Sequence, residues 1–253
     1  MQMTFWRTSE DKVFRMLADE NSQPTYVGTL ETTVFRSGEW LCELIKFISR
    51  VLPNWRDDPN RQMKTSETAL TAQLCARLNS ASNHTPGWDF LQFRREEPDE
   101  IESSRSIDLV AAPNCSRLNV DGINYTEYKT LLPIECKRLP TPSGKDRDER
   151  EYLYSQFKTT GGVQRFKAGH HAASHERAAM IAYVQDESIP YWVNKIETWI
   201  SGLESGNVDG WSASDHLEFG SHDTVSNIAT LFSNHSRSKD LNPIDIDHLW
   251  IEM

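Results

Sequence analysis

The chain has 253 residues, with 38% apolar and 25% charged side chains, a formal net charge of −10 and a pI near 5.3. This composition is that of a globular protein and argues against extensive disorder, while the acidic balance argues against a protein that coats nucleic acid indiscriminately. No apolar run approaches the roughly 20 residues of a membrane span, and the first residues lack the apolar region of a secretion signal, so we expect an intracellular, cytoplasmic protein without a membrane partner.

Cysteines and basic residues are distributed unevenly. The cysteines lack the paired spacing of zinc sites, and a disulfide framework is not expected without a secretion signal. We therefore predict four reduced thiols, at Cys42, Cys75, Cys115 and Cys136. Between Lys129 and His171, nine Lys and Arg residues stand against five Asp and Glu residues. This locally positive segment leaves room for an anionic substrate in an otherwise acidic chain.

Apolar residues at helical spacing predict helices in the first third of the chain. One spans Ser37–Leu52, with its first residue as N-cap, and Pro53 ends it. A second spans Thr65–Ser82, where Thr65 or Ser66 is of the residue type that caps helices. Weaker patterns fit a helix at residues 10–20 and a strand at residues 29–35.

The rest of the chain alternates strand and helix patterns. Runs of aliphatic and aromatic residues predict strands at Trp88–Phe93, Ser106–Ala112, Leu131–Leu139, Ala178–Val184 and Ile244–Ile251. Asp121-Gly122 is a typical hairpin turn, and the charged residues after Phe93 predict a loop. Helices are expected at Asp148–His171, with a break near Gly161-Gly162, at Ile189–Leu203 and at Thr224–Phe232. We predict one α/β domain over residues 65–253 and a mostly helical addition over residues 1–64.

Glu135 and Lys137 stand two positions apart in the mostly aliphatic strand Leu131–Leu139. Alternate side chains of a strand face the same side, so Glu135 and Lys137 project together and Cys136 faces away. Burying such charges is costly unless they are paired, and a divalent cation would pair with them. If the strand of Asp108 is adjacent, its carboxylate and that of Glu135 meet at one Mg²⁺, which prefers oxygen ligands. The alternative is a buried salt bridge without catalytic function.

A helix with Glu67, a strand with Asp108 and a strand with Glu135-Cys136-Lys137 resemble, in this order, the PD-(D/E)xK nuclease superfamily. Its restriction-endonuclease-like core runs α-β-β-β-α-β, as do the elements predicted over residues 65–185, about half of the chain. The sequence departs from the name-giving motif at Ile107, where that motif has Pro. The resemblance implies a mixed central sheet flanked by helices, here with a helical N-terminal addition.

The resemblance also implies roles for these residues. Asp108, Glu135 and the backbone carbonyl of Cys136 would bind Mg²⁺, for which Mn²⁺ could substitute. Lys137 would position or help to deprotonate the attacking water and stabilise the charge developing on the phosphate. Glu67 would be a further catalytic metal ligand, directly or through water. The alternative for Glu67 is a carboxylate that suits the positive end of its helix dipole.

Residues after the Glu-x-Lys strand extend the expected site. Relatives place polar residues on the following helix, so Gln164 and Arg165, together with Arg138, are candidates for substrate binding; Tyr152 is a weaker one. The alternative for Gln164 and Arg165 is a helix break with an exposed polar turn.

Three histidines, His170, His171 and His175, invite comparison with a zinc site or an HNH-type nuclease. They lack cysteine partners and a second set of ligands. We therefore interpret them as part of a solvated loop.

The sequence thus predicts a Mg²⁺-dependent endonuclease acting on nucleic acid, with DNA favoured and RNA as an alternative. By analogy with proteins of this fold, we expect a microbial restriction or anti-phage defence system. A helicase or sensor protein, or assembly into a homo-oligomer, would supply targeting or activation. The alternative function is that of a catalytically silent module that keeps the fold for nucleic-acid binding or assembly. The pattern does not distinguish one metal ion from two.

Overall fold

The computed structural model describes residues 38–99, 102–157, 160–208, 210–237 and 240–253, all within one compact unit. The elements predicted at residues 10–20 and 29–35 lie outside these ranges, and so does Ser37, the predicted cap of the first helix. The proposed division of the chain at residue 64 stays a prediction.

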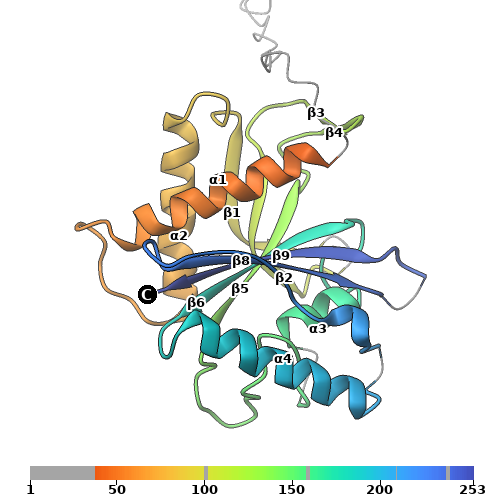
Figure 1. The fold of residues 1–253 in the computed structure, drawn as a ribbon. Helices are drawn as coiled ribbons and strands as arrows, with labels where there is room; N and C mark the ends of the chain where they lie inside the picture. Colours follow the sequence, from red (N-terminus) through yellow and green to blue (C-terminus); the bar gives the residue numbers. More distant parts are fainter. Residues whose placement is uncertain (1–37, 100–101, 158–159, 209, 238–239) are drawn as a thin grey trace, which may run out of the picture. The chain divides into compact units, whose positions relative to one another are not determined.

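A seven-stranded mixed sheet forms the centre of the described residues, which confirms the α/β class (Figure 1). In spatial order its strands are β1 (Leu91–Pro98), β2 (Ser106–Pro113), β5 (Leu132–Leu139), β6 (Arg177–Val184), β9 (Ile244–Glu252), β8 (Ile228–His235) and β7 (Glu218–Asp223). The neighbours β5, β6 and β9 run parallel, and the other neighbouring pairs are antiparallel. The parallel strands are largely buried, as expected for strands covered on both faces.

Helices cover both faces of this sheet (Figure 1). On one face α1 (Glu39–Arg56) and α2 (Glu67–His84) share a hydrophobic cluster with Ile134 and Cys136. On the other face α3 (Gly162–Lys167) and α4 (Ile189–Ser205) share a second cluster. Because side chains alternate along β5, this arrangement leaves Glu135 on the side of α3. None of the helices in the described ranges has the length and apolar character needed to cross a bilayer.

Local sequence signals determine several elements as predicted. The Ser66 hydroxyl caps α2 by accepting the backbone N–H of Ala69 at 3.4 Å. The hairpin of β3 (Leu118–Val120) and β4 (Ile123–Tyr125) turns at Asp121-Gly122, with φ angles of 51° and 80°. Both angles have the sign that a tight two-residue hairpin turn requires. The bounds of α4, β2, β5, β6 and β9 also follow the predicted ones closely.

The prediction that Pro53 ends the first helix is wrong. The helix α1 continues to Arg56, and the carbonyl of Pro53 accepts the N–H of Asp57 at 3.0 Å. Trp55 in this last turn is 2% exposed, and its ring lies 5.7 Å from that of Tyr183. Burial of this large side chain offsets the backbone hydrogen bond that proline cannot donate.

Two predicted helices are also wrong. Among the described residues of Asp148–His171 only α3, after the predicted break, is an α-helix. The part before the break is not helical, since the Asp148 carboxylate accepts the N–H groups of Arg150 and Gln156 at 3.0 and 3.1 Å. Such bonds offer the backbone an alternative to a helix. The second segment, Thr224–Phe232, leads into β8, which pairs with β7 on one side and β9 on the other. Pairing with both neighbouring strands overrides the local helical pattern.

Candidate active site

The strands β2 and β5 are neighbours, and their pairing stops where the predicted site begins. The ladder ends at the pair Leu109–Ile134. One residue beyond it, Oδ2 of Asp108 accepts the backbone N–H of Cys136 at 2.9 Å. A carboxylate thereby replaces the next bond of the ladder and satisfies a backbone donor that would otherwise be free. The expectation that the strands of Asp108 and Glu135 are adjacent is confirmed.

The other neighbour of β2 is irregular at the same position. The strand β1 extends to Pro98, so the first part of the segment predicted as a charged loop, up to Pro98, belongs to a strand. It pairs with β2 on both sides of Glu96, but Glu96 itself has a φ of 51° and no partner in the register. This backbone conformation is unfavourable for a residue other than glycine. Asp108 therefore lies where the ladder between β2 and β5 has ended and the ladder between β2 and β1 is interrupted.

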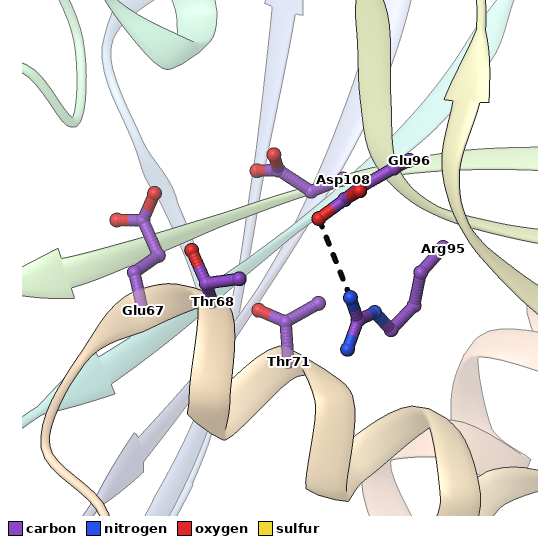
Figure 2. A pocket seen from close by; sticks show the side chains of 6 residues that line it. All are labelled: Glu67, Thr68, Thr71, Arg95, Glu96 and Asp108. Atoms are coloured by element: carbon purple, nitrogen blue, oxygen red, sulfur yellow. Dashed lines mark hydrogen bonds and ion pairs between the residues drawn. The ribbon is translucent and has the colours of Figure 1, made fainter.

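Figure 2 shows a pocket that the side chain of Asp108 helps to line. The pocket is lined by Glu67, Thr68 and Thr71 of α2, Arg95 and Glu96 of β1, and Asp108 of β2. The side chains of Asp108 and Glu67 are 27% and 30% exposed, whereas that of Glu135 is completely covered. Solvent therefore reaches the first two carboxylates, and Glu135 lies behind them in the protein interior.

The ammonium group of Lys137 joins the predicted site residues. Its Nζ donates to Oε1 of Glu135 at 2.8 Å and to the carbonyl oxygen of Cys136 at 3.1 Å. It also lies 3.5 Å from a carboxylate oxygen of Asp108 and 3.5 Å from one of Glu67. One nearly buried cation therefore stands among four oxygen atoms from three different elements.

These contacts shift the pKa values of the charged groups. Burial alone would raise the pKa of Glu135, but the charge of Lys137 and two further neighbours hold it well below its ordinary range. Burial would lower the pKa of Lys137, but the surrounding carboxylates raise it well above its ordinary range. Burial and the charge of Glu135 raise the pKa of Asp108 to about 6. At neutral pH the centre therefore holds an ionised Glu135 and a protonated Lys137.

Glu67 reaches the site from the first turn of α2. Its Oε2 accepts the backbone N–H of Arg138 at 3.2 Å, and its Oε1 lies 3.5 Å from the ammonium of Lys137. The carboxylate thus links α2 to β5 beside the other candidate ligands, in addition to its favourable position at a helix N-terminus.

Two residues that come later in the chain than β5 contact Glu135 from the side of α3. NH1 of Arg165 lies 2.5 Å from Oε1 of Glu135, so this predicted substrate-binding residue belongs to the centre. His171 is only 2% exposed, and its Nδ1 lies 3.2 Å from Oε2 of Glu135 without hydrogen-bond geometry. The interpretation of His171 as a solvated residue is wrong, because the chain folds back over β5 after α3. No spacing signal in the sequence pointed to this contact.

The remaining candidates are engaged elsewhere or only partly in the site. The amide oxygen of Gln164 accepts the N–H groups of Ser155 and Gly161, at 3.1 and 3.3 Å, so it holds the loop before α3. Arg138 contributes its backbone N–H, and its buried Nε has no hydrogen-bond partner. Tyr152 is completely buried in the core on the side of α3. A role of Gln164 and Arg138 in substrate binding stays a prediction.

The oxygen donors of the centre suit a hard divalent cation. Asp108 and Glu135 supply carboxylates, and Cys136 a carbonyl, the ligand types that Mg²⁺ and Mn²⁺ prefer. Oε2 of Glu135 is buried without a hydrogen-bond partner, a costly state that a cation would relieve. Within the described ranges, no three Asp, Glu, His or Cys side chains surround a common point. The ammonium of Lys137 stands between the oxygens instead, so a metal ion held by them requires this side chain to move.

Comparison with known proteins found no relative of the chain. No protein-family model, no curated protein and no solved structure matches the chain.

Proposed function

We propose that the chain is a metal-dependent nuclease that hydrolyses phosphodiester bonds, of DNA in the first instance, with its centre at Asp108, Glu135 and Lys137. The observation that carries the proposal is the convergence of these residues where β2 and β5 separate, with Lys137 Nζ 2.8 Å from Glu135 and 3.5 Å from Asp108. A buried carboxylate beside a second carboxylate and a lysine is an expensive arrangement for stability alone.

The order of elements around the centre supports the resemblance to the PD-(D/E)xK nucleases. The chain runs α2-β1-β2-β5-α3-β6, with the small β3–β4 hairpin inserted between β2 and β5. This is the α-β-β-β-α-β order that the resemblance implies, and Asp108, Glu135 and Lys137 stand on its second and third strands. Glu67 stands on its first helix.

The chain's residues have distinct parts in the proposed reaction. Asp108, Glu135 and the Cys136 carbonyl would hold Mg²⁺ or Mn²⁺, which when bound activates water and neutralises phosphate charge. The ammonium of Lys137 would donate to the attacked phosphate or to the attacking water and stabilise negative charge as it develops. Arg165 is a second cation beside the same carboxylate and would bind a phosphate oxygen.

Cleavage of plasmid DNA by the purified full chain tests this proposal. Wild type with Mg²⁺ or Mn²⁺ should cut, whereas Glu135→Ala and Lys137→Ala should not. Glu149→Gln, which changes a 69% exposed carboxylate, is the matched control and should retain activity. The same reactions with RNA distinguish the substrate. Equal inertness of all four proteins on both nucleic acids, with and without a helicase or sensor protein that co-purifies with the chain, would refute the enzymatic role.

One observation favours a catalytically silent module as the second candidate. Lys137 and Arg165 both contact Oε1 of Glu135, so the described centre is already balanced by two cations. Such a module would bind nucleic acid or a partner without cutting, and its DNA affinity would not depend on Mg²⁺.

A further inference from the structure

A second buried polar cluster lies on the face of the sheet covered by α3 and α4, and the chemistry proposed above does not use it. Its members share exposures of 7% or less and come from α3, the segment before β7, β8, β9 and the loop before α3: Lys167, Asp215, Ser233, His235, His248 and Tyr152. Buried polar groups at this density are costly unless they are fully hydrogen-bonded. Their bonding therefore decides whether the cluster stabilises one particular arrangement.

The cluster begins with an ion pair. The ammonium of Lys167 donates to Oδ1 of Asp215, and Nδ1 of His235 lies 2.5 Å from the same oxygen. The Lys167 ammonium also stands 5.1 Å from the centre of the Trp211 ring, within the range of a cation–π contact. The last residue of α3 is thereby held to the segment that precedes β7 and to β8.

The cluster continues across two strands to the loop before α3. Oγ of Ser233 lies 2.7 Å from Nε2 of His235 and 2.7 Å from Nε2 of His248, and Nδ1 of His248 lies 2.6 Å from the hydroxyl of Tyr152. Trp250 donates its indole N–H to the same hydroxyl at 2.8 Å. An unbroken series of hydrogen bonds therefore runs from Asp215 to Trp250.

One assignment of protons satisfies all of these bonds. Burial lowers the pKa of both histidines, that of His248 to about 3, so both rings are neutral. Tyr152 then donates to His248, His248 to Ser233, Ser233 to His235, and His235 to Asp215. Each donor hydrogen of Tyr152, His248, Ser233 and His235 is then used once. The order Asp215–His235–Ser233 resembles that of a hydrolase triad, but Ser233 is 1% exposed and is already engaged by His248.

The helix α3 connects this cluster to the proposed catalytic centre. It has only six residues, too few to be stable by itself. Arg165 and Lys167 are two positions apart, which is about 200° around a helix, so their side chains leave it on nearly opposite sides. Arg165 contacts Glu135 on β5, and Lys167 contacts Asp215. An ion pair thus holds each side of a short helix.

We infer that Lys167 and Asp215 are positioning residues, which hold α3 so that the guanidinium of Arg165 stays on Glu135. The inference rests on the proposed function in assigning a catalytic consequence, but the placement of Arg165 can be measured without activity. By this inference the segment at residues 211–215 and the strands β8 and β9 help to position the centre. Among the described residues, none of these three contacts the carboxylates of the centre.

Nuclear magnetic resonance of the full chain measures this placement directly. The resonance of the Arg165 NH1 group, which contacts Glu135, is identified by its loss in Arg165→Met and should be shifted and protected in the wild type. In Lys167→Met it should move to the position and exchange rate of a solvent-exposed arginine. The control Arg177→Met breaks another partly buried ion pair, with Asp247 at 2.8 Å, and should leave this resonance unchanged. An unchanged Arg165 resonance in a folded Lys167→Met protein overturns the inference.

Cleavage rates supply the second readout. Lys167→Met should lower kcat about tenfold, as expected for a small misplacement of a catalytic group, and Lys167→Arg should restore most of it. If Lys167 acts through Arg165, the double variant should be no slower than Arg165→Met. Losses that multiply would overturn the inference, whereas an inactive wild type with the expected resonances would count against the nuclease function alone. Should Lys167→Met not fold, Lys167→Met with Asp215→Asn removes the pair without leaving a buried lone carboxylate.

Discussion

Replacing Lys137 by methionine separates the role of its charge from that of its aliphatic stem. The change removes an ammonium that lies within 3.5 Å of oxygens of Asp108, Glu135, Cys136 and Glu67. Glu135, with a side-chain exposure of 0%, then keeps Arg165 as its hydrogen-bonded cation. Breaking a buried ion pair costs about 3 kcal/mol. In a chain of this size that loss lowers the melting temperature by about 6–12 °C.

The same substitution should strengthen the binding of a divalent metal ion. On the proposed function, the Lys137 ammonium of the wild type occupies the space between the oxygens that would hold Mn²⁺, so the two cations would compete. In Lys137→Met this competition is absent, and Mn²⁺ at about 100 times its Kd adds about 2.7 kcal/mol to the stability. Metal should therefore recover most of the lost stability, while cleavage falls at least about a hundredfold because a group that stabilises the transition state is missing.

Thermal unfolding at increasing Mn²⁺ concentrations measures both effects, and plasmid cleavage is followed in parallel. The control Lys46→Met removes a lysine on α1 whose ion pair with Glu43 is exposed to solvent, and it should behave like the wild type. If Mn²⁺ stabilises the wild type and Lys137→Met equally, Lys137 does not stand in the metal site. If Mn²⁺ stabilises neither protein, the oxygens of the centre do not hold a metal ion.

Three further predictions address the site, the buried histidines and the loop before α3. Glu135→Gln should abolish plasmid cleavage and Mn²⁺-dependent thermal stabilisation, and retention of both would exclude Glu135 as a ligand. The pKa of His235 is lowered and that of His248 falls from 6.5 to about 3. On acidification these histidines therefore bind protons in the unfolded chain before they do so in the folded chain. The contribution of His248 to stability is therefore present above pH 6.5 and is lost on acidification, by about 2 kcal/mol at pH 5. Because the raised pKa of Asp108 contributes in the opposite direction, the measurement is urea unfolding of Asp108→Asn, and a result independent of pH would contradict this. A Cβ at Gly161 would lie 2.4 Å from Cα of Tyr154, so Gly161→Ala should cost about 1–3 kcal/mol in urea unfolding, and an unchanged midpoint would show that the loop yields freely.

The elements that could be predicted are those whose signals are local. Ser66 and the apolar spacing after it define α2, and the turn Asp121-Gly122 defines the hairpin, because capping and positive φ angles depend on a few adjacent residues. The helix prediction for Thr224–Phe232 was wrong because β8 is determined by pairing with β7 and β9, which lie on either side of it in the sheet. The end of α1 was predicted wrongly at Pro53 for a similar reason: the helix continues because Trp55 is buried, and this burial depends on a contact with β6.

The candidate site divides in the same way. Glu135 and Lys137 were found from the two-residue period of one strand, and Asp108 from its apolar surroundings in another. Arg165 was placed near the site only by resemblance, and the burial of His171 against Glu135 was missed. No periodic pattern relates these two residues to Glu135, because the loop and short helix between them have no regular repeat.

The sequence by itself determined which side chains share a face of β5 and that an acidic pair with a lysine stands among aliphatic residues, because the pleat of a strand is a local property. The tertiary structure alone decided that β2 and β5 separate at Asp108, that the Lys137 ammonium stands among four oxygens, and that the cluster beyond α3 joins Lys167 to Trp250. Those features depend on contacts between residues distant in the chain, whose free energy is gained only when the whole sheet is assembled.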